Sequence, residues 1–320
     1  MTRVGVIGVG SMGSQHARVY NSFQDAELVG VADANKTAAS ETAKKYNTDA
    51  FDKKELLERV EALSIVVPTQ YHYEITREAI EANVDVLVEK PFVANPDNGK
   101  ELIKLAEQEG TLIQVGHIER FNPAVMVLED VLADKNVLAY EARRLGPAPN
   151  RGIRDSVVMD LMIHDIDIIR WLADDTPDVI QATGLTERTG QKGAHATTTF
   201  MFDSEKMATI TASHITQKKV RELRISTEEC YVMVDYLDGQ IEIHRESVPE
   251  LVSGEEEVRY RHESVVERPV VDNTEPLKNE LSSFLSAVEG DHELFVDAKQ
   301  GLDAVKLGRT VEQEAFSSTK

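Results

Sequence analysis

Cysteine is almost absent from this sequence, with Cys230 as the single example in 320 residues. One cysteine cannot form an internal disulfide or supply several thiolate ligands, which excludes a disulfide-stabilised secreted domain and a multi-cysteine metal cluster. Long apolar runs are also missing, because no stretch of 18 apolar residues occurs and the run from Val4 to Val9 is too short for a signal peptide. We therefore expect a soluble cytoplasmic protein, in which Cys230 is a half-buried strand residue.

Basic residues are scarce relative to acidic ones. The chain has 35 Lys and Arg against 56 Asp and Glu, a formal net charge of -21. A field of that sign repels phosphate polymers, so we expect neither nucleic acid nor an anionic membrane as a partner. Any phosphate must be bound by local groups. The acid excess is spread along the chain, which would also suit a high-salt cytosol.

The length and a hydrophobic content of 41% favour two domains. From Val4 to Gly116, short β-rich runs alternate with helical patterns, which predicts a doubly wound parallel sheet with crossover helices. The expected strands are residues 4–9, 28–32, 64–67, 86–89 and 112–115. Apolar residues at helical spacing predict helices at residues 12–21, 36–46, 53–60, 71–82 and 96–109.

The pattern changes after Asn122 and Pro123, where a helix, a strand at residues 137–144 and a helix at 157–172 are expected. Partial alternation of apolar and polar residues then predicts consecutive antiparallel strands at residues 179–187, 194–202, 207–214, 221–226, 231–236 and 240–244. An acidic loop at 254–257 and helices at 275–289 and 296–315 complete the expectation. The sequence thus predicts an α/β domain over residues 1–117 and an α+β domain over residues 118–320.

The segment Gly8-Val9-Gly10-Ser11-Met12-Gly13 matches the pattern GxGxxG, which is a weak signal on its own. Here it follows an apolar strand and opens a helix. In that context Gly8 makes the tight turn, Gly10 lets a pyrophosphate approach the backbone, and Gly13 lets helix and strand pack closely. The helix N-terminus, with Ser11 and Met12 in its first turn, then faces the phosphates. The first domain is therefore predicted to be a Rossmann domain that binds a dinucleotide.

Asp33 ends the second expected strand, 20 residues after Gly13. A carboxylate at this place reaches the hydroxyls of the adenosine ribose and repels a ribose phosphate. No arginine stands beside Asp33, so NAD is favoured over NADP, although Lys36 lies near enough to leave NADP open.

Ligands of doubly wound sheets bind beyond the carboxyl ends of the strands, so residues at these ends are candidates for the nicotinamide site. The candidates are Pro68 and Thr69, His72 on the following helix, Glu89 and Lys90, and His117. A lysine at a buried strand end is costly unless it is paired or takes part in chemistry. A role in the reaction and an ion pair with Glu89 are both consistent with Lys90.

Asp160 and His164 lie four residues apart on the helix expected at residues 157–172, which places them on one face. An imidazole beside a carboxylate can accept a hydroxyl proton while hydride leaves the same carbon. A histidine that only forms hydrogen bonds within the core is the alternative. A metal site is rejected, because the carboxylates of Asp160, Asp165 and Asp167 and the imidazole of His164 cannot all converge on one ion from a single helix.

Taken together, the glycine loop, the stretch from Pro68 to His72, the Glu89-Lys90-Pro91 motif and the pair Asp160 and His164 resemble the Gfo/Idh/MocA family of sugar and cyclitol dehydrogenases. The resemblance covers essentially the whole chain. It implies that Lys90 lies beside nicotinamide and substrate, and that Asp160 and His164 complete the catalytic set. It also implies an open antiparallel sheet in the second domain and a homo-oligomer.

Within the family, residues 116–123 and 164–167 resemble the branch that oxidises UDP-N-acetylglucosamine at its 3-hydroxyl. One departure concerns the residues before the catalytic aspartate, where many members are glycine-rich and this chain has Ser156-Val157-Val158-Met159. The substrate expected from this match is a nucleotide sugar, and His117, Arg120 and Asn122 are assigned to its binding. Asn122 before Pro123 could instead cap a helix.

An arginine cluster supports a substrate with a diphosphate. Four arginines fall within twelve residues that contain no acid: Arg143, Arg144, Arg151 and Arg154. Guanidinium groups suit a diphosphate, but Arg143 and Arg144 are strand neighbours that point to opposite faces, so one of them at most faces the cleft. We therefore assign Arg144, Arg151 and Arg154 to substrate binding, with ion pairs to surface carboxylates as the alternative.

The resulting hypothesis is an NAD-dependent dehydrogenase. His164, oriented by Asp160, accepts the hydroxyl proton while Lys90 holds the substrate oxygen, and Lys90 and His164 could exchange the role of base. A UDP-amino sugar is the expected substrate, and a free sugar or a cyclitol such as inositol is the alternative. A non-catalytic cofactor-binding regulator of the same fold is a further alternative, which the presence of all three residues disfavours.

Overall fold

The computed structural model of the protein describes residues 1–148, 155–188, 191–246, 250–253, 258–261 and 264–317. They belong to two compact units. The first consists of Met1–Phe121 and Thr274–Leu307, and the second of Asn122–Asn273 and Gly308–Lys320. Within the described residues, none of the helices combines the length and apolar character needed to cross a bilayer.

The first unit contains a six-stranded parallel sheet in the order β3-β2-β1-β4-β5-β6. Its strands are β1 (Thr2–Ile7), β2 (Ala26–Ala32), β3 (Asp49–Ala50), β4 (Ala62–Ile65), β5 (Asp85–Glu89) and β6 (Ile113–Gly116). The strand order reverses between β1 and β4, and in such sheets the ligand crevice lies at this point, beyond the carboxyl ends of the strands. The predicted doubly wound domain is confirmed.

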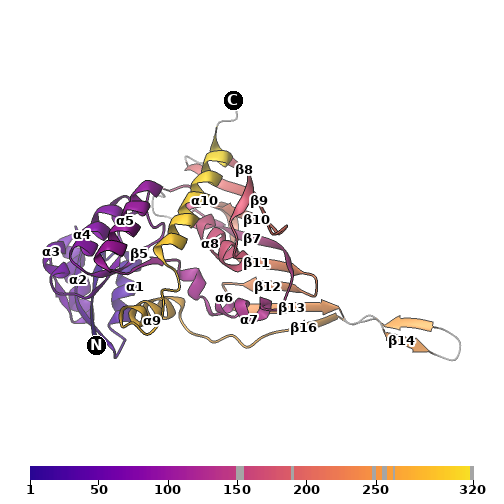
Figure 1. Cartoon of the computed structure of the whole chain (residues 1–320), viewed down its shortest axis with the longest axis horizontal. Helices are drawn as coiled ribbons and strands as arrows, with labels where there is room; N and C mark the ends of the chain where they lie inside the picture. The colour runs from indigo at the N-terminus through magenta and orange to yellow at the C-terminus, as the bar shows by residue number, and fades with distance from the viewer. Residues whose placement is uncertain (149–154, 189–190, 247–249, 254–257, 262–263, 318–320) are drawn as a thin grey trace. The chain divides into compact units, whose positions relative to one another are not determined.

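The connections between these strands are helical (Figure 1). They are α1 (Ser11–Tyr20), α2 (Lys36–Tyr46), α3 (Lys53–Leu57), the 3-10 turn η1 (Thr69–Tyr71), α4 (His72–Glu81) and α5 (Pro96–Glu109), and the 3-10 turn η2 (Ile118–Phe121) follows β6. Side-chain caps fix where two of them begin, because Asn35 accepts from the amides of the first turn of α2 and Asn95 does the same for α5. Helix α1 packs beside α2, and α4 beside α5.

Two late segments return to the first unit, α9 (Pro276–Val288) and the first part of α10 (Ala298–Phe316). The apolar face of α9 joins the core around α1 through Leu277, Leu281 and Phe284. The backbone amide of Val115 on β6 donates to Val296 O at 3.0 Å. The units therefore depart from the single expected boundary after residue 117, since local patterns do not reveal which domain a distant helix joins.

The second unit has an eight-stranded sheet in the order β16-β13-β12-β11-β7-β10-β9-β8, antiparallel except where β7 pairs with β10. Its strands are β7 (Val137–Pro147), β8 (Pro177–Arg188), β9 (Gln191–Phe202), β10 (Met207–Ser213), β11 (Ile215–Thr227), β12 (Tyr231–Asp235), β13 (Gln240–Glu246) and β16 (Ser264–Glu267). Strands β14 (Glu250–Ser253) and β15 (Val258–Arg261) pair separately. The predicted mainly antiparallel sheet is confirmed.

The helical segments of the second unit are α6 (Pro123–Met126), α7 (Leu128–Leu132), the π-helical turn η3 (Val158–Met162) and α8 (Ile163–Ala173). Most residues of α8 are buried, and the helix packs against β7 and β10. The sequence did not predict β3, β14, β15 or β16, whose two to four residues are too short for a period to emerge. Cys230 is buried just before β12 begins, not within a strand. The expected acidic loop at 254–257 lies outside the described residues.

Candidate active site

The loop from β1 to α1 and the first turn of α1 together contain three glycines with different surroundings. Gly8 has a φ of 89°, and a Cβ at this position would lie 2.3 Å from Val66 O. A Cβ on Gly13 would lie 1.8 Å from Gly8 O. Gly10, the N-cap of α1, has no neighbour among the described residues within 4 Å of the place a Cβ would take. Gly8 and Gly13 therefore allow the turn and the close packing, and Gly10 leaves room for a phosphate at the helix N-terminus.

Asp33 connects the end of β2 to this glycine loop. Its Oδ2 accepts a hydrogen bond from the Val9 amide at 2.8 Å, and its Oδ1 accepts one from the Asn35 amide at 2.7 Å. The carboxylate is half-buried. Asp33 thus fixes the loop that presents Gly10, a role that the sequence did not predict, in addition to its expected contact with ribose.

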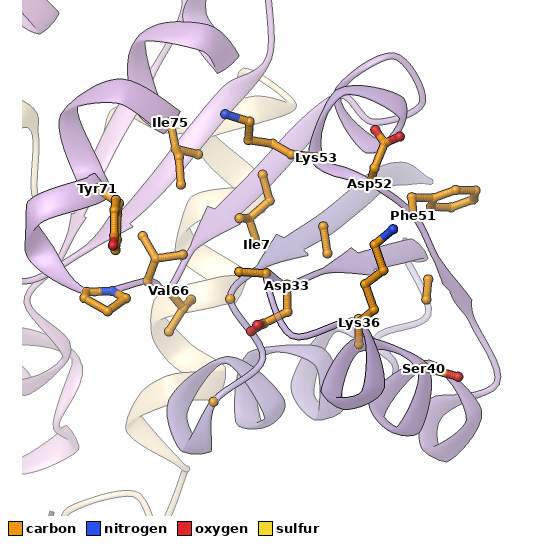
Figure 2. Close-up of a pocket in the computed structure, with 18 residues that line it drawn as sticks. Ile7, Asp33, Lys36, Ser40, Phe51, Asp52, Lys53, Val66, Tyr71 and Ile75 are labelled. Carbon is orange, nitrogen blue, oxygen red and sulfur yellow. The ribbon is translucent and has the colours of Figure 1, made fainter.

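A cavity of about 1030 Å³ lies beyond the carboxyl ends of β1, β2 and β4 (Figure 2). Gly8, Gly10, Asp33, Val66 and Pro68 are among the residues that line it. Its volume reaches the upper end of the range of small-molecule sites, about 300 to 1,000 Å³. Apolar walls around one anchored carboxylate fit the adenosine end of a dinucleotide, and four of the predicted cofactor residues line this cavity: Gly8, Gly10, Asp33 and Pro68.

Two lysines are the cations among the described residues that line the cavity. Lys53 pairs with Glu78. The amino group of Lys36 points toward Asp52 and Phe51 in Figure 2, away from the carboxylate of Asp33. Among the described residues that line the cavity, no arginine accompanies Asp33.

His72 begins α4, and its ring is buried. Its Nδ1 lies 2.9 Å from Pro91 O and its Nε2 lies 2.8 Å from Val67 O. Burial lowers the pKa of His72, although these carbonyl groups oppose the shift. The ring lies between the ends of two strands, and as a neutral imidazole with one N–H it donates a hydrogen bond to only one of these carbonyl groups. This corrects the expected direct contact with cofactor, because both ring nitrogens already face backbone carbonyls. Thr69 begins η1, and its contact with cofactor stays a prediction.

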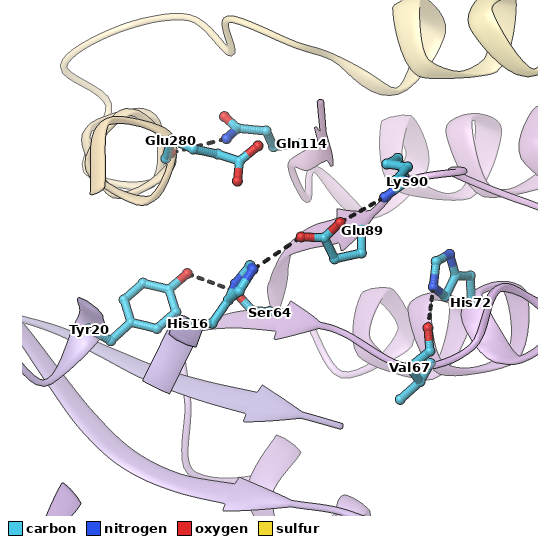
Figure 3. A network of polar contacts seen from close by, with 9 residues as sticks. All are labelled: His16, Tyr20, Ser64, Val67, His72, Glu89, Lys90, Gln114 and Glu280. Carbon is cyan, nitrogen blue, oxygen red and sulfur yellow. Dashed lines mark hydrogen bonds and ion pairs between the residues drawn. The ribbon is translucent and has the colours of Figure 1, made fainter. Parts of the chain in front are cut away.

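Glu89 is the last residue of β5, and Lys90 follows it (Figure 3). Glu89 Oε1 lies 3.1 Å from His16 Nε2, and its Oε2 accepts from the backbone amide of Lys90 at 3.2 Å. The side chain of Glu89 therefore holds the strand end that carries Lys90, and its contact with cofactor stays a prediction. Lys90 itself is partly exposed, and its contact with substrate stays a prediction.

The end of β6 lies in close contact with Glu89 at the end of β5. A Cβ on Gly116 would lie 3.1 Å from the Cα of Glu89, so the two strand ends are in close contact. His117 and Arg120 follow, and both are buried. Their assignment to substrate binding stays a prediction.

Asn122 begins the second unit as a helix cap. Its Oδ1 accepts from the Ala124 amide at 3.1 Å, and Pro123 occupies the first position of α6. Its Nδ2 donates to Tyr236 O at 3.4 Å. The capping alternative for Asn122 is therefore confirmed.

Asp160 lies on the π-helical turn η3, and π-helical turns are frequent at functional sites. Its Oδ2 lies 3.1 Å from Nε2 of His214, a buried residue between β10 and β11. His164 is in the first turn of α8 and has 9% of its surface exposed. The expected helix is present, but Asp160 has a histidine partner that sequence reasoning missed, because no local pattern joins β10 to this helix.

Arg144 is buried and forms a bidentate ion pair with Asp165. Its Nε and one terminal nitrogen donate to the two carboxylate oxygens at 2.8 and 2.9 Å. The guanidinium also lies over the ring of Tyr236, 5.2 Å from the centroid. This corrects the assignment of Arg144 to a diphosphate, since its fork already holds a buried carboxylate. Its strand neighbour Arg143 is half-exposed.

Arg151 and Arg154 lie outside the described residues. They stay predictions.

Two family models match the chain. Residues 2–117 match the model of an oxidoreductase family with an NAD-binding Rossmann fold, and residues 137–232 match the Gfo/Idh/MocA C-terminal domain. The chain belongs to the Gfo/Idh/MocA oxidoreductase family. Its place there confirms the predicted resemblance and the predicted class of enzyme.

Two curated members of the family match nearly the full length of the chain. The UDP-N-acetylglucosamine 3-dehydrogenase of Acidithiobacillus ferrooxidans is 33% identical over 318 residues, which is 98% of this chain and 98% of that protein. The inositol 2-dehydrogenase of Rhizobium meliloti is 26% identical and covers 95% of this chain and 94% of its own length.

Solved structures of family members agree with this result. A structure of the UDP-N-acetylglucosamine 3-dehydrogenase from Acidithiobacillus ferrooxidans has a TM-score of 0.90 at 30% identity, over 99% of this chain and 98% of that chain. An NAD-binding protein from Listeria innocua has a TM-score of 0.85 at 17% identity, over 99% of this chain and 97% of that chain, which shows the shared fold alone.

Proposed function

We propose that this protein oxidises a hydroxyl of a UDP-sugar to a ketone with NAD, and that the 3-hydroxyl of UDP-N-acetylglucosamine is its target. The observation that carries the proposal is the 33% identity with a UDP-N-acetylglucosamine 3-dehydrogenase over 98% of both chains. The anchored carboxylate of Asp33 supports NAD over NADP. A cytoplasmic homo-oligomer is part of the same proposal.

The first unit supplies the cofactor site and one reactive side chain. Gly10 leaves room for a phosphate, and Asp33 offers an acceptor to the ribose hydroxyls. When bound, the oxidised nicotinamide supplies the hydride acceptor. Glu89 holds the backbone of Lys90 in place, and the ammonium group of Lys90 stabilises negative charge on the substrate oxygen.

The second unit supplies the proton acceptor. His164 takes the hydroxyl proton as the carbon is oxidised. The carboxylate of Asp160 orients the imidazole and stabilises its charged form, and His214 holds Asp160 from the other side. Asp160 therefore gains a fixed orientation from a buried group.

A panel of substrates tests the proposal. Reduction of NAD is followed by absorbance with UDP-N-acetylglucosamine, UDP-glucose, glucose and myo-inositol, each in low and in molar salt. We expect the highest kcat/KM for UDP-N-acetylglucosamine, with a 3-keto product by mass spectrometry. Faster turnover of a free sugar than of every UDP-sugar would overturn the substrate assignment. Faster turnover with NADP would overturn the cofactor assignment.

A cyclitol is the second candidate substrate. Inositol 2-dehydrogenases are among the family members that match this chain, one of them over 95% of its length. The pairing of Arg144 with Asp165 also removes one of the arginines that were expected to bind a diphosphate. The myo-inositol arm of the panel distinguishes the two substrate classes.

A further inference from the structure

A chain of buried polar groups lies behind the strand end that carries Lys90 (Figure 3). The hydroxyl of Tyr20 is 2.9 Å from Ser64 Oγ, and Ser64 Oγ is 3.1 Å from His16 Nδ1. His16 Nε2 meets Glu89, which accepts from the backbone amide of Lys90. The chain of contacts therefore leads from Tyr20, the last residue of α1, to the backbone of Lys90.

Glu280 of α9 completes this group of side chains. It is fully buried, and its carboxyl oxygen lies within 4.8 Å of the facing atoms of His16 and Glu89. Neither of its carboxyl oxygens has a hydrogen-bond partner among the residues that the structure describes. Its backbone carbonyl accepts from the Gln114 side chain at 3.3 Å. The carboxyl group of Glu280 thus lies beside a polar cluster but forms no hydrogen bond with its described residues.

A charge on Glu280 would be poorly tolerated there. A buried carboxylate without donors loses its hydration, and the negative charge of Glu89 repels it at this distance. Glu89 differs: burial raises its pKa, but the hydrogen bond from His16 and the nearby basic groups together hold that pKa below its ordinary value. Burial and the charge of Glu89 raise the pKa of Glu280 well above 4.5. The titratable groups that face it are His16 and Tyr20 from α1 and Glu89 at the end of β5.

A metal ion is a less suitable occupant than a proton. The two ring nitrogens of His16 already meet Ser64 and Glu89, and both oxygens of Glu89 have partners. A metal would have to replace the contact between His16 and Glu89, whereas a proton on Glu280 leaves it intact.

We propose that Glu280 is a positioning residue that the fold keeps as a neutral carboxylic acid beside the His16–Glu89 pair, so that no second negative charge lies behind Lys90. The consequence for catalysis rests on the proposed function, because it assumes that Lys90 acts on the substrate oxygen. A second carboxylate would attract the ammonium group of Lys90 and so compete with the substrate oxygen for it. The neutral acid avoids this competition.

Infrared spectroscopy and stability measurements test the protonation without using activity. At neutral pH the parent protein should show the carbonyl band of a protonated carboxylic acid, which Glu280→Gln should remove and the control Glu289→Gln, at the exposed end of the same helix, should keep. A group with a raised native pKa contributes stability below its unfolded pKa and loses it as the pH rises. As the pH rises above about 4.5, the melting temperature of the Glu280→Gln variant should therefore increase relative to that of the parent protein. Absence of the band, or a constant difference in melting temperature, overturns the proposal.

Kinetics test the positioning role. Glu280→Met should lower kcat about ten- to a hundredfold with little change in the KM for NAD, the range for displaced reacting groups. Glu280→Gln should recover most of that loss, because a neutral amide keeps the shape and polarity. Equal activity of the Met and Gln variants overturns the role, and so does a metal bound stoichiometrically to the parent and lost from both variants. If the parent oxidises no sugar while the infrared band is present, the proposed function fails and the assignment of the proton stands.

Discussion

Asp160 Oδ2 lies 3.1 Å from Nε2 of His214, a residue 54 positions later in the chain. Asp160 is on a π-helical turn, and its carboxylate is 25% exposed while the ring of His214 is almost completely buried. A buried donor therefore holds the carboxylate, which keeps an accessible edge toward solvent. This arrangement suits a group that must orient another side chain during a reaction.

We expect His214→Leu to lower kcat by about tenfold or more, because Asp160 loses the donor that orients it. His214→Gln can still donate and should recover part of the loss. Steady-state kinetics with the best substrate of the panel provide the measurement, and His244→Gln on β13 is the control. If His214→Leu raises only the KM, the histidine binds substrate and does not act through Asp160.

Asp33 offers a second prediction. Asp33→Ala should weaken NAD binding by about tenfold or more and narrow the preference for NAD over NADP, since the ribose hydroxyls lose an acceptor and the Val9 amide loses its partner. Fluorescence titration with both cofactors measures the two constants. Lys36→Gln is the matched variant at the same cavity and should change NADP binding more than NAD binding. An unchanged preference in Asp33→Ala would remove Asp33 from the site.

Much of the first unit could be predicted from sequence because its signals are local. The strand before Gly8, the helix after it and the acid at Asp33 are read from consecutive residues, and the structure has all three. The segment Thr274–Leu307 could not be assigned to the same unit. Its helix α9 shows an apolar face, but an apolar face does not identify the core that it joins.

The candidate site was predictable as a set of positions but not as a set of contacts. His72 and Arg144 were assigned to ligands because of their place and charge, yet both are buried against partners distant in sequence. His214 and Glu280 were missed for the same reason, since Asp160 and Glu89 approach them only through the fold. A polar or charged residue near a strand end therefore indicates that a site is nearby, but it does not reveal whether the side chain contacts a ligand or a buried group of the protein.

Because Arg144 pairs with Asp165, we expect substitution of Arg144 to reduce the stability of the protein and not its affinity for substrate. Arg144→Gln should lower the free energy of unfolding by about 3–5 kcal/mol, because it leaves the buried carboxylate of Asp165 without its cation. Arg143→Gln, on the neighbouring position of β7, should change it by less than about 0.5 kcal/mol. Urea unfolding of the two variants gives the comparison. A raised KM for UDP-sugar with unchanged stability in Arg144→Gln would return Arg144 to the substrate site.

The buried ring of His72 predicts a pH dependence of stability. Because burial lowers its native pKa, the unfolded state binds a proton more tightly, and stability must fall as the pH drops through about 6.5, where an unfolded histidine titrates. His72→Asn should reduce this acid-induced loss. It should also cost about 1–3 kcal/mol at neutral pH, because a carbonyl loses its donor. Thermal unfolding between about pH 7.5 and pH 5.5 measures both effects. The control, His292→Asn at an exposed position, should keep the slope of the parent.

Lys90 allows the two candidate proton acceptors to be separated. Lys90→Met should lower kcat by about a hundredfold or more while NAD affinity stays within about tenfold, as for a group that acts on the reacting atoms. Lys90→Arg keeps the positive charge but cannot lose its proton. If Lys90 only stabilises the substrate oxygen, the arginine variant should recover part of kcat and keep the pH profile of the parent. If Lys90 is the base, the two variants should be equally impaired and His164→Asn should retain more activity than either. A Lys90→Met variant with the turnover of the parent would instead make Lys90 a structural residue of the strand end.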